Sequence, residues 1–191
     1  MLSTLFRISS VLLLCTSVMA NDIYITQSGD SLNLDIVQDG QNNQIEGLSG
    51  SGSAIIYGAN STASFNQTGD NNQIRVWSDS SSGKSSTSNQ TGNSNISLVD
   101  NHGQDNTITM NVTGNSNYAF NEIGNGGDTD NTITTTINGD SNNVIAEVQN
   151  GDSNTIDVQV QSQDNNIVRV YVNGDNNNAK VWQGKHEDGN V

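Results

Sequence analysis

The stretch Ser61-Thr-Ala-Ser-Phe-Asn-Gln67-Thr-Gly69-Asp-Asn-Asn72-Gln-Ile74-Arg-Val-Trp-Ser78 decides the fold. Small or apolar residues alternate with other residues on both sides of Gly69, which is the period of a β-strand with one buried face. Glycine accepts the positive φ of a tight turn without steric cost, and Asp and Asn are favoured beside it because their side chains can bond their own backbone. The stretch therefore predicts a strand, a turn and a second strand.

The same unit recurs along the chain at a nearly constant spacing, and Asp128 and Gln163 take the place of glycine in two repeats. Two weaker positions near Ser80 and Lys185 bring the total to about fourteen half-repeats, or seven units of about 22 residues, a period typical of a solenoid. The predicted turn glycines are Gly29, Gly40, Gly58, Gly69, Gly92, Gly103, Gly114, Gly139, Gly151 and Gly174.

Positions five and seven after the clear glycine slots carry no charged residue and are mostly small or apolar, whereas positions six and eight collect the charged ones. A strand pair with one apolar face cannot bury that face alone, so consecutive units must stack on each other. The sequence thus predicts an all-β fold, a β-solenoid of about seven strand-turn-strand repeats that stacks as cross-β amyloid with coils about 4.8 Å apart. The predicted apolar core includes Ile74, Ile108, Val144, Ile156, Val158 and Val168.

Amide side chains also recur at fixed places in the repeat. Asparagine nearly always stands three residues after the glycine slot, and glutamine often stands two residues before it. Stacking aligns them in columns, where each amide can hydrogen-bond to the next along the axis. The predicted ladders contain Asn43, Asn72, Asn95, Asn117, Asn142 and Asn166 in one column, and Gln38, Gln67, Gln90, Gln161 and Gln183, interrupted by Val112 and Ile137, in the other.

Residues 1–20 have the features of a secretory signal peptide: Arg7, a short apolar stretch at 11–14, and Val18-Met19-Ala20 at the end. No later segment approaches the roughly 20 apolar residues of a membrane-spanning helix. We therefore expect a secreted protein that is not a transmembrane protein, with a repeat domain over residues 21–191.

Charge and cysteine content restrict the chemistry of the mature chain. The one cysteine, Cys15, lies in the predicted signal peptide, so neither disulfides nor thiol chemistry is expected. Without Arg7, five basic residues stand against twenty acidic ones, which is a formal charge of −15. Such a charge excludes nucleic acid as a partner. The absence of proline agrees with uninterrupted strand ladders.

Two polar stretches interrupt the repeat. One is Gly47-Leu-Ser-Gly-Ser-Gly-Ser53, and the other is the serine-rich run from Asp79 to Ser88. Gly/Ser-rich segments of this kind are flexible. We predict flexible insertions at about 47–53 and 79–88.

The chain resembles the curlins, the secreted subunits of bacterial curli fibres. Their repeat is Ser-x5-Gln-x-Gly-x2-Asn-x-Ala-x3-Gln, which Ser61 to Ser78 matches with Ile74 in place of the small residue and Ser78 in place of the last Gln. Degenerate copies run through the mature chain. Two departures leave open whether the chain is like the major subunit or the nucleator: residues after Ala20 lead almost directly into the first repeat, and the final repeat is not strongly basic.

This resemblance implies a fibre-forming homopolymer that functions in biofilm matrix and surface adhesion. It also implies export through an outer-membrane secretion pore of the curli type, before folding, and a sister subunit, either nucleator or major curlin, as a partner. The expected location is extracellular, in a cell-surface fibre.

Catalysis is not expected. His102 and His186 lie at or beside predicted turns, and the acidic residues lie in turns or on outer strand faces without an apolar pocket that would raise a carboxyl pKa. The Gly-Asp turns differ in period from calcium-binding β-rolls, so neither a metal site nor a cofactor is predicted. Two alternatives to a fibre subunit remain, a monomeric solenoid adhesin with capped ends and an ice-binding protein. The latter needs outward threonines in every coil; Thr132, Thr134 and Thr136 give one row, but Asp35, Arg75, Asp157 and Arg169 occupy equivalent positions.

Overall fold

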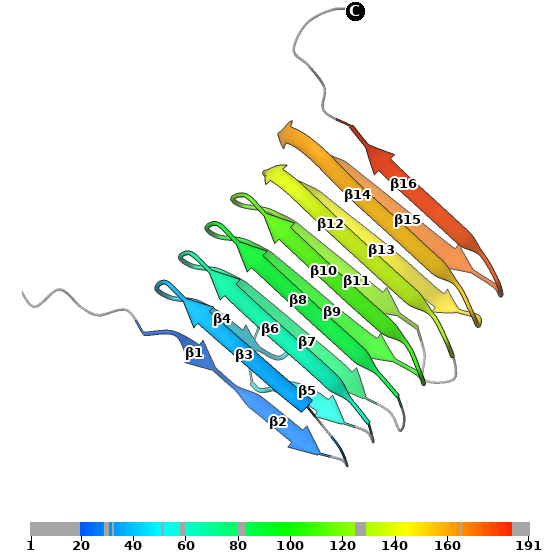
Figure 1. Ribbon diagram of the computed structural model, residues 1–191, viewed down its shortest axis with the longest axis horizontal. Coiled ribbons are helices and arrows are strands. Elements are labelled where there is room, and N and C mark those ends of the chain that lie inside the picture. Colours follow the sequence, from blue (N-terminus) through cyan, green and yellow to red (C-terminus); the bar gives the residue numbers. More distant parts are fainter. Residues whose placement is uncertain are drawn as a thin grey trace, which may run out of the picture.

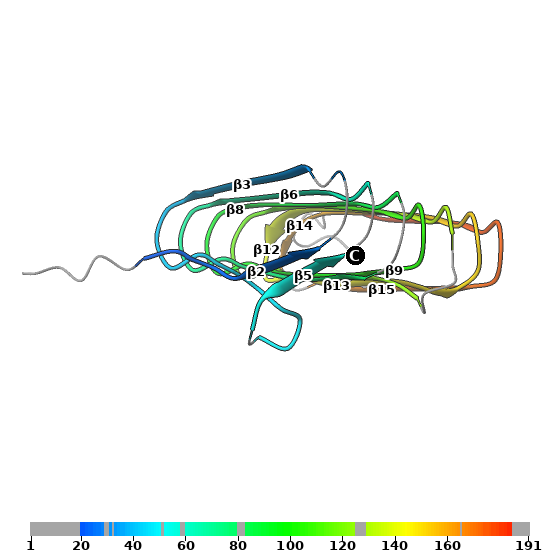
Figure 2. The ribbon, with the colours of Figure 1, turned by 90° about the horizontal axis from the view of Figure 1, so that it is seen from below.

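The computed structural model describes residues 20–184, apart from 29–30, 32, 51, 58–59, 80–82, 125–128 and 165. Every regular element in this part of the chain is a β-strand, and the strands form two facing parallel sheets (Figure 1, Figure 2). Sheet A consists of β1 (Asp22–Ile23), β2 (Ile25–Ser28), β4 (Gln44–Glu46), β5 (Ala54–Tyr57), β7 (Gln73–Asp79), β9 (Ile96–His102), β11 (Tyr118–Ile123), β13 (Asn143–Asn150) and β15 (Ile167–Asn173). Sheet B consists of β3 (Asn33–Asp39), β6 (Thr62–Thr68), β8 (Ser85–Thr91), β10 (Thr107–Thr113), β12 (Thr132–Asp140), β14 (Thr155–Asp164) and β16 (Asn178–Gln183).

The chain passes from one sheet to the other and back, so each strand pairs with the strand one coil away. We call one coil a rung, counting from rung 1 (β1, β2 and β3) and rung 2 (β4, β5 and β6) to rung 7 (β15 and β16). Thr107 in β10 pairs with Ser85 one rung below and with Thr132 one rung above. The described residues pass through seven rungs in about six turns, and residues that hydrogen-bond across neighbouring rungs, such as Gln67 and Gln90, are typically 23 positions apart. This arrangement confirms the predicted β-solenoid.

The core lies between the sheets and receives every second residue of each strand. In β10, for example, Ile108, Met110 and Val112 are buried, whereas Thr109 and Asn111 between them are not. A shift of one residue would turn this set toward solvent, so the alternation determines the register. The predicted core residues all lie here: Ile74, Ile108, Val144, Ile156 and Val158 are 0% exposed, and Val168 is 5% exposed.

In the described turns that have a glycine slot, two positions have positive φ. The first is the glycine slot, where Gly40, Gly69, Gly92, Gly103, Gly114, Gly139, Gly151 and Gly174 have φ between 95° and 143°, while Gly29 and Gly58 lie outside the described residues. The second, two residues later, has φ of 54° to 60° and is always Ser, Asn or Asp, residues that visit the left-handed region at modest cost. Glycine is also required sterically, because a Cβ on Gly92 would lie 2.0 Å from the Gly114 carbonyl oxygen one rung above.

The predicted insertion at 47–53 connects β4 to β5 and projects away from the outer side of sheet A (Figure 2). The loop is closed by a hydrogen bond from the Gly47 N–H to the Gly52 carbonyl, 3.1 Å. Both β4 and β5 pair with β7, so they are two parts of one strand on rung 2. The loop lengthens that coil, because Gln44 pairs with Gln73, which lies 29 residues further along the chain.

The predicted insertion at 79–88 is wrong over its second half. Ser85 to Ser88 belong to β8, which pairs along its whole length with β6 and β10. Ser86 and Ser88 occupy inward positions and are buried. Composition suggested a linker, but a strand with partners on both sides obtains its backbone hydrogen bonds from them and needs only small side chains to fit the core. Residues 80–82 lie outside the described part.

Candidate functional site

A ladder of asparagines runs along the turns that lead from sheet B to sheet A. The backbone N–H of Asn95 donates to Asn72 Oδ1 one rung below at 3.0 Å, and its side-chain amide donates to the same oxygen at 3.1 Å and to the Gly114 carbonyl one rung above at 2.7 Å. Both donors and both lone pairs of such an asparagine are therefore used. The connected residues are Asn43, Asn72, Asn95, Asn117, Asn142 and Asn166, with Asn21 accepting from the Asn43 N–H at the lower end.

The glutamine ladder is shorter than the predicted one. The side-chain amide of Gln38 donates to Gln67 Oε1 at 2.7 Å, and that of Gln67 donates to Gln90 Oε1 at 3.0 Å. Above Gln90 the same column continues with apolar residues until it reaches Gln183 on rung 7: Val112, Ile137 and Val160.

Gln161 is not part of this column, so that prediction is wrong. Gln161 is exposed and pairs with Asn138, whereas Val160 lies between Ile137 and Gln183. The prediction counted back from the next glycine slot. The inward positions of β14 instead follow by strand alternation from Ile156 and Val158 at its start, and the repeat is one residue longer here.

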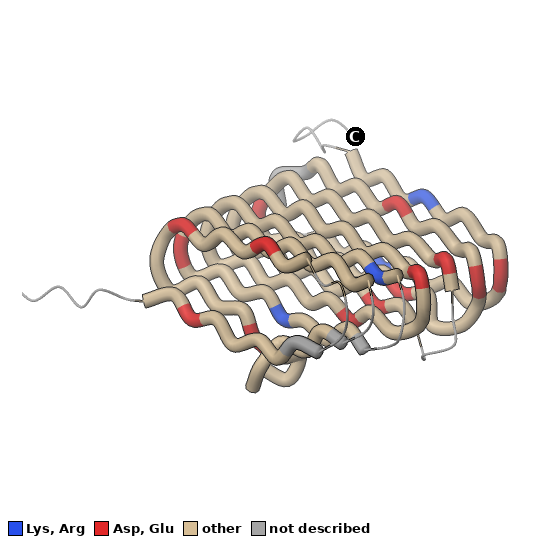
Figure 3. The backbone as a smooth tube through the Cα atoms, turned by 60° about the horizontal axis from the view of Figure 1, so that its bottom comes forward, with Lys and Arg blue, Asp and Glu red and all other residues tan. Residues whose placement is uncertain are grey.

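The residue after the glycine slot forms a further ladder on the surface at each edge of the solenoid. Asp70 Oδ1 accepts the backbone N–H of Gln41 at 2.8 Å, and Asp152 Oδ1 accepts that of Thr129 at 2.8 Å. These side chains were expected to bond their own backbone. They bond instead to the turn one rung below, so they connect coils. Acidic positions are accordingly frequent along the turns at both edges, and basic positions are few (Figure 3).

The core contains a polar section on rungs 3 and 4 that the sequence analysis did not anticipate. Gln90 donates to Ser97 Oγ at 2.9 Å, and Asn101 donates to Ser86 Oγ at 3.2 Å. Lys84, predicted to lie in a flexible insertion, is 3% exposed, and its ammonium donates to the Asn101 carbonyl at 2.9 Å. The signal that could have revealed this section is the alternation of serines in β8, which follows the strand period.

Three carboxylates share one outward column of sheet A. Glu122 pairs with Asp100 below and Glu147 above, and His102 Nε2 lies 2.6 Å from Asp100 Oδ1. Burial, and then the negative charges of Asp100 and Glu147, raise the pKa of Glu122, while His102 opposes them. Among the described residues, no group of three or more His, Cys, Asp or Glu side chains could hold a metal ion. His186 lies outside the described residues.

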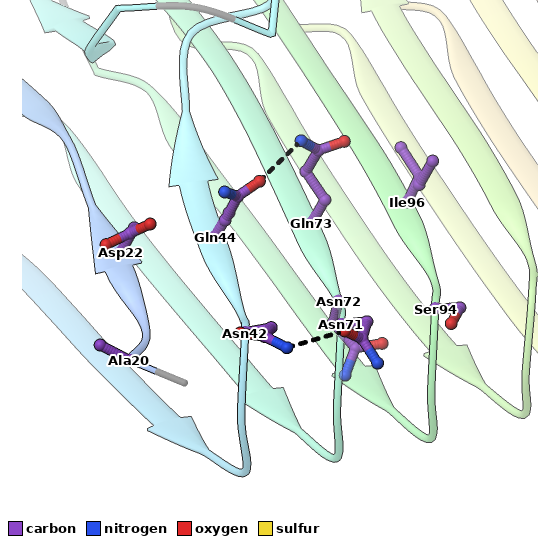
Figure 4. Close-up of a pocket in the computed structure, with 9 residues that line it drawn as sticks. All are labelled: Ala20, Asp22, Asn42, Gln44, Asn71, Asn72, Gln73, Ser94 and Ile96. Atoms are coloured by element: carbon purple, nitrogen blue, oxygen red, sulfur yellow. Dashed lines mark hydrogen bonds between the residues drawn. The ribbon is translucent and has the colours of Figure 1, made fainter. Parts of the chain in front are cut away.

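A surface groove of about 490 Å³ follows the turns of rungs 1 to 4 and is lined by ladder residues and their neighbours (Figure 4). Gln73 donates to Gln44 Oε1 at 3.2 Å, and Asn42 donates to Asn71 Oδ1 at 3.1 Å. Asp22 is the one ionisable residue among those that line it. The groove thus presents amide edges without a pair of groups for proton transfer.

The outer face of sheet B carries rows of hydroxyl side chains. One outward column contains Thr62, Ser85, Thr107, Thr132 and Thr155, and the next contains Ser64, Thr87, Thr109 and Thr134. The four charged residues expected to interrupt an ice-binding face lie on two different sheets. Arg75 and Arg169 belong to sheet A, and Asp35 and Asp157 border the hydroxyl rows on rungs 1 and 6.

The two end rungs differ from the interior ones. Among the described residues, six of the seven exposed large hydrophobic side chains lie there: Ile23, Tyr24 and Val37 on rung 1, and Ile167, Tyr171 and Trp182 on rung 7. Inward apolar residues are only partly buried at the ends, namely Ile25, Leu34, Ile36, Ala179 and Val181. The side-chain Oε1 of Gln38 on rung 1 is buried without a hydrogen-bond partner. Each end thus exposes core and ladder residues.

No protein-family model matches the chain, and comparison with curated proteins and with solved structures finds no match. In the described part of the chain, no helix is both long and apolar enough to cross a membrane.

Proposed function

We propose that the mature chain is a secreted structural subunit that polymerises into extracellular cross-β fibres, which serve biofilm matrix and surface adhesion. The observation that carries this proposal is the concentration of exposed and half-buried apolar side chains on the two end rungs. Exposed parallel strand edges are templates for pairing with another chain. A second copy stacked on either end would continue both sheets, the core and the ladders.

Fibre formation by residues 21–191 tests the proposal directly. We expect the purified chain, left unagitated at tens of micromolar, to develop thioflavin fluorescence and a diffraction ring at about 4.8 Å, the spacing of paired strands. Preformed fibres added as seeds should remove the lag phase. A chain that stays monomeric for days would contradict the proposal and favour the adhesin alternative.

Export is the second part of the proposal. The resemblance to curlins supports removal of residues 1–20, passage of the unfolded chain through an outer-membrane pore and nucleation by a sister subunit. A stable, fast-folding domain fused to the C-terminus should block surface display, because a folded domain would not pass the pore. Normal display of the folded fusion, judged by antibody labelling of intact cells, would contradict the unfolded passage.

An ice-binding protein is the second candidate, and the hydroxyl rows of sheet B favour it. Their hydroxyls are spaced at about 4.8 Å across strands and about 6.6 Å along them, on a regular parallel sheet. Inhibition of ice recrystallisation by the monomeric protein, abolished by Thr109→Lys, would support this candidate. Fibre formation without any effect on ice would exclude it.

A further inference from the structure

We propose that the fibre is polar and that rung 7 of one copy stacks on rung 1 of the next in uninterrupted register, so that Gln183 continues the column of Gln38. This inference rests on the proposed function and adds which residues meet. β16 and β15 form one end of the solenoid, and β3, β1 and β2 form the other (Figure 1). In-register continuation brings β16 beside β3 of the next copy.

The amide side chains at the two ends can exchange partners when the ends meet. In the single chain, Gln183 Nε2 donates to Asn166 Oδ1 at 2.6 Å, while Gln38 Oε1 has no hydrogen-bond partner. Within the ladders, the side-chain amide of a glutamine donates upward, as that of Gln38 does to Gln67, and the backbone N–H of an asparagine donates downward, as that of Asn43 does to Asn21. In the junction, Asn21 of the upper copy donates to Asn166, and Gln183 is released to donate to Gln38 of the upper copy. The buried acceptor is then satisfied.

The outward side chains of the two ends also match. Continuing the register of β14 with β16 and of β3 with β6 sets Lys180 against Asp35 and Trp182 against Val37 of the next copy. Trp182 is 70% exposed and Val37 is 50% exposed in the single chain, so their contact removes apolar surface from water. Lys180 lies opposite Asp157 in the register of the strand below, so in the junction it stands between two carboxylates.

The inward side chains of the two ends match as well. The same register places Ala179 and Val181 below Leu34 and Ile36 of the next copy, and these are among the apolar residues that are only partly buried in one chain. Stacking like ends together would instead oppose parallel strands in antiparallel fashion and would break both ladders. The junction is therefore heterologous, which builds an open filament rather than a closed dimer.

Cysteine pairs test this register. Val37→Cys with Trp182→Cys, in the chain from residue 21, places two thiols on neighbouring strands about 4.8 Å apart at each junction, within disulfide reach. Within one chain they lie six rungs, or about 29 Å, apart. We expect oxidised fibres to give a ladder of covalent multimers on a non-reducing gel and unassembled protein to give monomer.

Asn33→Cys with Trp182→Cys is the matched control, because position 33 lies four residues, about 13 Å, away along the strand. We expect at least a tenfold lower yield of multimers from it, with the same thioflavin signal. Equal yields, or multimers from the control alone, would overturn the register while leaving fibre formation intact. Dimers from Val37→Cys alone would show that like ends meet and would overturn polarity. Failure of the unsubstituted chain to form fibres would remove the proposed function itself.

Discussion

The effect of substituting a single residue in this fold depends on the face of the strand on which its side chain lies. Val158 is 0% exposed and the adjacent Gln159 is exposed. We predict that Val158→Lys abolishes fibre growth, because an unpaired ammonium in a dry core costs several kcal/mol. Gln159→Lys should grow at nearly the original rate, since an exposed charge near Asp157 is worth about 0–1 kcal/mol. Thioflavin kinetics measure both, and tolerance of Lys at 158 with loss at 159 would contradict the observed facing.

Glu122 makes the stability dependent on pH. Burial, Asp100 and Glu147 raise its folded pKa above the ordinary value of 4.5, so the folded chain binds the proton more tightly than the unfolded chain. The contribution of Glu122 to the free energy of unfolding should therefore be most favourable below the ordinary value and should be lost as pH rises through the raised pKa.

Glu122→Gln tests this dependence. The variant should be more resistant to guanidinium than the original chain at neutral pH and should lose part of the pH dependence. Glu122→Asp, which keeps the charge, is the matched control. If the original chain and the Glu122→Gln variant had identical guanidinium midpoints at pH 4 and at pH 8, the role of the carboxylate column would be contradicted.

At the scale of the elements, the stacked turns leave little space for a side chain at the glycine slots. Gly92 and Gly52 both have positive φ, 113° and 80°, but a Cβ at Gly92 would meet the next turn at 2.0 Å whereas nothing lies within 4 Å at Gly52. Gly52→Ala should cost only the backbone strain, about 1–2 kcal/mol. We predict a clearly larger loss for Gly92→Ala, seen as a lower guanidinium midpoint or no fibres. Similar losses for the two variants would show that the stacking of turns is not tight.

The loop at 47–53 divides a strand that is otherwise regular. Deletion of these seven residues would reduce the separation of partners on neighbouring rungs from 29 to 22, the value found between β8 and β10. It would join β4 to β5 with Ile45, Ala54 and Ile56 on the inner face, where they already lie. We predict that the deletion variant forms fibres with equal or slightly greater guanidinium resistance, because loop closure no longer costs entropy. Loss of fibres would indicate that the loop takes part in assembly.

At the scale of the whole molecule, fibre assembly joins strongly acidic chains. The few basic side chains should therefore affect the elongation rate where they lie at the junction between two chains. Asp35→Lys and Lys180→Asp should each slow elongation about two- to fivefold, as expected for an exposed pair worth up to about 1 kcal/mol. The double variant should elongate faster than the product of the two single effects predicts, because the charges are again opposite across the junction. Elongation from matched seeds, followed by fluorescence, measures this. Strictly multiplicative effects would argue that the two side chains do not meet.

The part of this structure that depends on local spacing could be predicted from the sequence. Coil length, the inward residues such as Ile108 and Val158, and the asparagine column all follow from counting forward from a turn, because strand alternation and turn geometry act over a few residues. The counts failed where a coil is longer by one residue, at Gln161. They also failed where composition was used in place of period, at Ser85 to Ser88.

Contacts between coils were decided only by the tertiary structure. The burial of Lys84 against Asn101, the stacking of Asp100, Glu122 and Glu147, and the hydroxyl rows of sheet B each join residues that are far apart along the chain. Their neighbours depend on the exact length of every intervening turn and on which of the two sheets each strand joins. The sequence alone determined the chemistry of each side chain and the face of its coil on which it lies. The tertiary structure determined its neighbours in the adjacent coils, because the register between coils depends on the length of the whole intervening chain.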